Sequence, residues 1–172
     1  MQAGKDKIGI VMNVVDGKPQ FVHRTFAEFF TARWFSRNLN ENRNVLERIL
    51  FDRTYRVMTG MFDRMLAKDC PLHCAVIAGN YETVKTLLAQ GCDPNAVDNG
   101  GRTIMHIIAT GHTTCWDAIN HNSNYKASLH EASLHNTDSV LQWTRLQYAI
   151  KSEEWSIVEL LLQTMSTGLA SL

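Results

Sequence analysis

The chain has 172 residues, of which 45% are hydrophobic and 20% are charged, and its 17 basic side chains balance 17 acidic ones. A chain of this length buries roughly two-thirds of the surface that it exposes when unfolded, so one domain or two small ones fold without a disulfide framework. Balanced charge argues against a nucleic-acid surface, and no window reaches the roughly 20 apolar residues of a membrane span. Four unevenly spaced cysteines and the absence of a signal peptide favour a reducing compartment, and we predict the cytoplasm.

The first predicted element is a β-hairpin. Ile8–Val15 is rich in β-branched and apolar residues, which favour a strand. Asp16-Gly17 then supplies a dipeptide that tolerates positive φ at both centres of a tight turn. The return strand is expected at Gln20–Val22, and Pro19 predicts that it is short or lies at an edge.

A helix is predicted next, over Phe26–Arg37. Thr25 and Glu28 have the spacing of a capping box, in which two side chains satisfy two backbone donors at the start of a helix. Aromatic residues recur at three- and four-residue steps and form one stripe: Phe26, Phe29, Phe30, Trp34 and Phe35. We expect this stripe to face the core, with an aromatic cofactor cage as the alternative.

Apolar residues at helical spacing predict two further helices between Val45 and Leu66, separated near Asp52-Arg53. Basic and acidic residues alternate through this region: Arg43, Arg48, Arg53, Arg56 and Arg64 with Glu41, Glu47, Asp52 and Asp63. The alternation predicts a solvated face and argues against a groove for polyanions.

An internal repeat is the strongest pattern in the chain. Its unit heads are Pro71–Ala75, Thr103–Ala109 and Thr144–Ala149, and His73 and His106 lie 33 residues apart. This period, with a T-P-L-H-x-A pattern at the head, is typical of ankyrin repeats, and the chain from Asp69 resembles that family. The resemblance implies paired helices that stack through small residues and leucines, and a histidine that fixes each turn.

The repeats also depart from the family pattern. Cys70 replaces the threonine of the first head and Gln147 replaces the histidine of the third. The V-x-x-L-L pattern is missing after His112, so no second helix is expected in the middle unit. An insertion at Trp116–Thr137 predicts a loop with a helical turn around Ala127–Leu134.

A second resemblance concerns the N-terminal stretch. Phe21–Ala32 is similar to the end of the winged-helix region that follows a NACHT-type nucleoside triphosphatase module in some animal proteins with C-terminal ankyrin arrays. It implies that the chain is a piece of a longer protein. The predicted organisation is a winged-helix-like remnant (1–40), connecting or capping helices (41–67) and ankyrin repeats (68–172), the latter with units at 69–98, 99–138 and 139–165.

Catalytic and metal-binding patterns are weak. The sequence contains neither G-x-x-x-x-G-K-[ST] nor G-x-G-x-x-G, so it predicts no triphosphate site. The repeat head explains Cys70, His73 and Cys74, while a second group lacks the paired short spacings of a zinc site: Cys115, His121, His130 and His135. No G-x-S-x-G elbow is present, and we predict that the chain is not an enzyme and needs no cofactor.

The predicted fold class is mostly α, a short ankyrin stack preceded by a β-hairpin and helices. The resemblance implies a protein-protein interaction module, a scaffold or adaptor without nucleic-acid, membrane or small-molecule ligands. The alternative is the regulatory or sensor part of a NACHT-type nucleotide switch whose nucleotidase lies upstream. By position in the family's pattern, the expected partner-binding residues are Ile77, Asn99, Arg102, Thr110, Trp143 and Lys151. Trp143 is the favoured anchor, and Arg102 is expected to be an exposed tip residue.

Overall fold

The computed structural model describes residues 10–120 and 136–169, which are mostly helical, so the predicted fold class is confirmed. A β-hairpin and helices α1 to α3 precede three helix pairs. In chain order the elements are β1 (Val11–Val15), β2 (Lys18–Phe21), α1 (Arg24–Arg37), α2 (Arg43–Leu50), the 3-10 turn η1 (Arg53–Tyr55), α3 (Arg56–Leu66), α4 (Pro71–Ile77), α5 (Tyr81–Ala89), α6 (Ile104–Ala109), the 3-10 turn η2 (Thr113–Cys115), α7 (Trp116–Asn120), α9 (Arg145–Lys151) and α10 (Trp155–Leu169).

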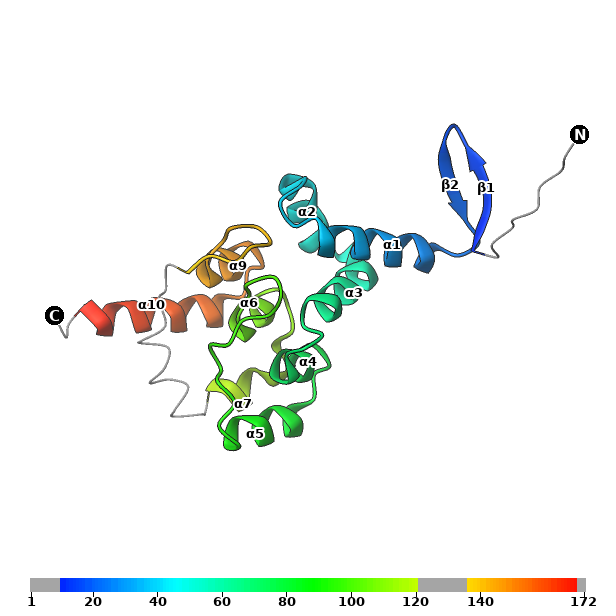
Figure 1. The fold of residues 1–172 in the computed structure, drawn as a ribbon. Helices are drawn as coiled ribbons and strands as arrows, with labels where there is room; N and C mark the ends of the chain where they lie inside the picture. Colours follow the sequence, from blue (N-terminus) through cyan, green and yellow to red (C-terminus); the bar gives the residue numbers. More distant parts are fainter. Residues whose placement is uncertain (1–9, 121–135, 170–172) are drawn as a thin grey trace, which may run out of the picture.

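The hairpin forms where the Asp16-Gly17 turn predicts it. Asp16 (φ 51°) and Gly17 (φ 73°) are both left-handed, as a tight hairpin turn requires, and Val15 pairs with Lys18 in an antiparallel register. Strand β2 is short, and its Pro19 pairs with Val14. The hairpin lies beyond α1, at the opposite end of the molecule from α10 (Figure 1).

Helix α1 begins earlier and is less covered than predicted. Its N-cap is His23, whose ring accepts a hydrogen bond from the Thr25 backbone (3.1 Å), so the predicted Thr25 capping box is wrong. Glu28 instead pairs with Arg24 at 2.8 Å. Of the aromatic stripe only Phe35 is buried, at 5% exposure. The other four aromatic residues are 36% to 42% exposed, which corrects the prediction of a fully covered core face.

The predicted break between the second and third helices is confirmed. The Asp52 carboxylate accepts a hydrogen bond from the Thr54 backbone (2.8 Å) and so caps η1, which leads directly into α3. Helix α3 packs against α1 on one side, and its buried face contributes Met58, Phe62 and Leu66 to the core.

Three helix pairs form the repeat stack: α4 with α5, α6 with α7, and α9 with α10. The first helices α4, α6 and α9 pack side by side in chain order (Figure 1). Small residues where these helices approach are buried, as the repeat pattern predicts. Ala75, Ala109 and Ala149 occupy these positions, and Val84 and Leu88 line the seam from α5. Leu87 is only half-buried against the same core.

The middle repeat is more complete than expected. After His112 the chain forms η2 and the five-residue helix α7, which packs against α5. The buried residues of this segment are Cys115 of η2 and Ala118 and Ile119 of α7, in place of the expected valine and leucines. The prediction that this repeat has no second helix is therefore wrong. The predicted loop at Trp116–Thr137 is wrong at its start, where Trp116–Asn120 form α7, and its helical turn at Ala127–Leu134 lies outside the described residues.

Candidate recognition surface

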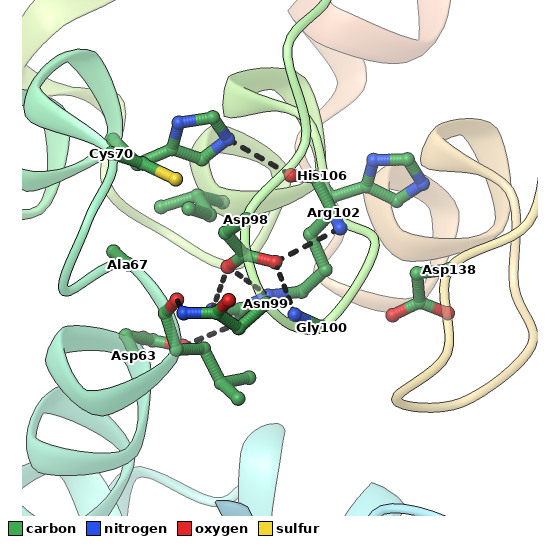
Figure 2. Close-up of polar contacts among 12 residues, drawn as sticks. Asp63, Ala67, Cys70, Asp98, Asn99, Gly100, Arg102, His106 and Asp138 are labelled. Carbon is green, nitrogen blue, oxygen red and sulfur yellow. Dashed lines mark hydrogen bonds and ion pairs between the residues drawn. The ribbon is translucent and has the colours of Figure 1, made fainter.

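The tip between the first two repeats is held by a buried ion-pair network around Arg102. This side chain is 1% exposed, and its guanidinium contacts the Asp63 carboxylate at 2.6 Å and the Asp98 carboxylate at 2.8 Å (Figure 2). The other Asp98 oxygen accepts from the backbone N–H groups of Gly100 (2.8 Å) and Arg102 (3.0 Å). Arg102 thus joins α3 to the tip, and the prediction that it is exposed is wrong.

Opposite charges offset the effect of burial on Asp63 and Arg102. Burial alone would raise the pKa of Asp63, but the neighbouring Arg102 and His112 more than offset it and hold that pKa below its usual value. For Arg102 burial acts in the opposite direction and would lower the pKa, but the Asp63 and Asp98 carboxylates outweigh burial and raise it. His112 lies 3.2 Å from the second oxygen of Asp63 and closes the network at the end of α6.

The tip backbone is also fixed to α3. The backbone N–H and the side-chain amide of Asn99 both donate to the Leu66 carbonyl, at 3.1 and 3.0 Å, and so satisfy an acceptor at the end of α3. Gly100 packs so closely that a Cβ there would lie 2.9 Å from side-chain atoms of Leu66 and Val140. Asn99 is exposed, as predicted, but its amide is engaged within the chain.

The repeat histidines have structural partners. His73 contacts the Arg102 carbonyl at 2.9 Å, and His106 accepts from the Thr103 backbone at 3.1 Å in a capping box. Burial lowers the pKa of both rings, and for His106 the charges of Arg145 and Arg102 add to burial and lower the pKa to about 3. Both histidines are therefore neutral at pH 7.

The third repeat replaces the histidine without losing its contact. Gln147 accepts from the Thr144 backbone at 2.8 Å and completes the same capping box. Asp138 takes the place of Asp98 in the next tip, where it accepts from the Trp143 backbone (3.0 Å) and from the Tyr148 hydroxyl. Burial raises the pKa of Asp138, and the hydrogen bonds from Tyr148, Trp143 and Leu141 offset it only in part.

Helix α2 covers the predicted anchor. The Phe51 ring, directly after α2, stacks on Trp143 with ring centroids 5.8 Å apart and also contacts Tyr148. Lys151 pairs with Glu47 of α2 at 3.0 Å, and its ammonium lies 6.0 Å from the Phe51 ring centroid. Trp143 is therefore half-buried by the chain itself, which corrects its prediction as an exposed aromatic residue.

The last two predicted partner-binding residues, Ile77 and Thr110, come from first helices of the repeats. Ile77 is buried, so its prediction as a surface contact is also wrong. Thr110 is half-buried, and its hydroxyl donates to the Ile107 carbonyl at 2.7 Å. Sequence reasoning missed Asp63, Glu47 and Phe51, because these residues precede the repeats and no spacing within a repeat points to them.

Catalytic and metal chemistry find no support in the described part of the chain. Residues 10–120 and 136–169 contain no group of three or more potential metal ligands. Cys74 donates to the Ala67 carbonyl at 3.0 Å, and burial raises the pKa of the Cys70 and Cys115 thiols, which disfavours the nucleophilic thiolate. The zinc candidates His121, His130 and His135 lie outside the described residues. No described helix has the length and apolar character of a membrane span.

The fold and its buried network define a helical repeat protein whose polar groups hold the stack together. A comparison with protein families gives the particular family. The family described as "Ankyrin repeats (3 copies)" matches residues 38–169, so the chain belongs to the ankyrin-repeat family and is a protein-protein interaction module. The match includes α2 and α3, and it leaves the hairpin and the whole of α1 outside. Neither the curated proteins nor the solved structures gave a match.

Proposed function

We propose that this chain is a non-enzymatic adaptor that recognises a protein partner through the surface of its ankyrin stack. One observation supports this most directly: buried charged and hydroxyl groups at the tips have partners within the chain, which tie the tips to the helices beside them. Arg102 with Asp63 and Asp98, and Tyr148 with Asp138, are the clearest cases. Function then rests on the exposed residues, which packing leaves free to contact another molecule.

The recognition surface that we propose differs from the one expected from the family pattern. Ile77 and Arg102 are buried, and Phe51 after α2 stacks on Trp143. Lys151 is exposed but paired with Glu47 of α2. Asn99 and Thr110 remain at the surface. We therefore assign recognition to the side of the stack that α2 leaves open, where the loop after α6 faces α3.

Selection of displayed peptides on the purified chain tests this proposal. We expect a family of related peptides that bind the native chain and fail to bind a Val84→Asp variant, because a buried unpaired charge in the seam unfolds the stack. If the folded chain enriches no peptide above background, the adaptor role is wrong.

The four cysteines are consistent with a cytoplasmic adaptor. Cys70, Cys74, Cys92 and Cys115 are all free thiols. Free thiols persist in reducing compartments, so a reducing location is the one that we propose.

An alternative function has its own supporting observation, the exposed aromatic face of α1. Phe29, Phe30 and Trp34 are each more than a third exposed, which suits a helix that docks on a further domain. In this alternative the chain is the regulatory part of a NACHT-type nucleotide switch. Sequencing the transcript upstream tests it, since the alternative requires a phosphate-binding loop there.

A further inference from the structure

The exposed charges of η1 and α3 all have one sign. Between Arg53 and Lys68 the chain has a single acidic residue, Asp63, and that side chain is buried against Arg102. The exposed residues are basic: Arg53, Arg56, Arg64 and Lys68. Two acids that precede this stretch are engaged elsewhere, because Glu47 pairs with Lys151 and Asp52 caps η1. The alternation of charge that argued against a groove for polyanions is therefore lost over η1 and α3 on folding.

A groove of about 680 Å³ follows this basic face. Helix α3 forms one wall, and the ends of α4 and α6 with their loops form the other. The lining includes basic and apolar side chains, principally Arg56, Val57, Arg64, Val76, Ile77 and His112. No aspartate or glutamate is among the described residues that line it. The groove thus combines positive charge with an apolar wall.

Two guanidinium groups of the groove are available to a ligand. Within residues 10–120 and 136–169 neither Arg56 nor Arg64 forms an ion pair with a carboxylate, and Arg64 donates only to the Gly60 carbonyl of its own helix, at 3.2 Å. Arg24, Arg102 and Lys151, by contrast, each have a carboxylate partner. An unpaired arginine beside an apolar wall is suited to bidentate contact with a carboxylate.

The spacing of the two arginines sets the form of the ligand. Arg56, Gly60 and Arg64 lie on successive turns of one α3 face, so the arginines are about 12 Å apart along the helix. The Arg64 guanidinium reaches back over Gly60, since it donates to the Gly60 carbonyl at 3.2 Å and a Cβ at Gly60 would lie 3.4 Å from it. An extended peptide rises about 3.3 Å per residue, so acidic residues up to four positions apart fall within the separation of the two backbone positions.

We propose that this groove binds an acidic segment of a protein partner in extended form. Two carboxylates contact Arg56 and Arg64, and an apolar side chain between them packs against Val57, which is 53% exposed and lines the groove. This inference rests on the proposed adaptor function and names its partner class. The exposed Val57 favours a peptide over a nucleic acid, whose phosphates would use the arginines and leave Val57 without an apolar partner.

Fluorescence anisotropy with a labelled synthetic peptide tests the proposal. The peptide carries two glutamates four positions apart with a leucine between them, and its control has glutamine in place of both glutamates. We expect the Arg56→Gln/Arg64→Gln variant to bind the acidic peptide at least about tenfold more weakly than the native chain. The matched variant, Arg37→Gln/Arg48→Gln, removes the same charge from exposed positions outside the groove and should bind like the native chain.

A steric variant separates the groove from general electrostatics. Gly60→Gln places a side chain between the two arginines without removing charge, and replacing a glycine inside a helix also favours folding. We expect this variant to keep or raise the melting temperature and to bind the acidic peptide at least about tenfold more weakly.

The outcomes distinguish this inference from the adaptor function itself. Equal binding by the two double variants, equal affinity for the glutamine peptide, or tighter binding of single-stranded DNA of the same length overturns the groove proposal. If displayed peptides still bind the native chain in any of these cases, the adaptor function stands. If neither the selected peptides nor the acidic probe bind the folded chain, both proposals fail.

Discussion

Replacing Arg102 by alanine should destabilise the fold strongly, although its position at a repeat tip resembles that of a surface residue. The guanidinium is 1% exposed and contacts Asp63 and Asp98, which are themselves buried. Its removal leaves two carboxylates without their counter-charge inside the protein. Breaking a buried ion pair from one side typically costs about 3 to 5 kcal/mol, and we expect a loss of unfolding free energy in that range.

This expected loss exceeds what an exposed arginine would give. Surface substitutions away from special features usually change stability by less than about 0.5 kcal/mol, so Arg53→Ala, which changes an exposed arginine, is the matched control. Urea unfolding followed by far-UV circular dichroism measures both variants. A single domain is stable by about 5 to 15 kcal/mol, so the Arg102 variant should also unfold at clearly lower urea concentration.

Two further measurements test whether the carboxylates left without Arg102 cause this loss of stability. The pKa of Asp63 is lowered in the folded state, so its contribution to stability is present above its unfolded value of 3.8 and is lost as the pH falls through the folded pKa. The difference between native chain and Arg102→Ala should therefore shrink below about pH 4. Arg102→Met/Asp63→Asn should recover part of the loss, because it removes one of the stranded charges. A loss below about 1 kcal/mol for Arg102→Ala, or no recovery in the double variant, would refute this reasoning.

Three other substitutions probe the same stack by urea unfolding. Gly100→Ala should cost about 1 to 3 kcal/mol, because the new Cβ would lie 2.9 Å from Leu66 and Val140, and a cost near zero would contradict that close packing. His106 stays neutral when folded, with its pKa lowered to about 3, so stability should fall by about 1.4 kcal/mol per pH unit below its unfolded value of 6.5. His106→Gln, the glutamine found in the third repeat, should reduce this loss between pH 6.5 and 5, and an unchanged pH profile would show that the ring does not cause it. Phe51→Ala should cost about 1 to 2 kcal/mol, less than a fully buried phenylalanine, and no cost would mean that α2 does not hold the third repeat.

Local patterns predicted the parts of the fold that depend on local forces. The hairpin turn at Asp16-Gly17 is determined by backbone conformations within two residues, and the structure confirms it. The repeat heads are similar, because a capping box joins residues three positions apart. The exchange of histidine for Gln147 shows the limit of a motif: the residue changes while the acceptor for the Thr144 backbone remains.

Long-range contacts determined what the sequence analysis did not predict. Arg102 and Asp63 are 39 positions apart, so the burial of that tip residue follows from the placement of α3 and from nothing within the repeat. The cover over Trp143 has the same origin in Phe51. Aromatic spacing on α1 predicted a core face, but only Phe35 of the five residues is buried, since whether a stripe is covered depends on which element packs against it.

The tip network and the groove are linked through α3 and share His112, which contacts Asp63 and also lines the groove. Asp63 contacts Arg102 and His112 on one side of the helix, and Arg64, the next residue, lines the groove. A ligand in the groove contacts α3 together with the ends of α4 and α6, so it binds only while α3 is docked on the repeats and stabilises that arrangement in return. Arg102→Ala should therefore weaken binding of the acidic peptide under conditions in which the repeats remain folded, although Arg102 lies outside the groove lining. Unchanged affinity in that variant would mean that α3 remains in place without its buried ion pairs.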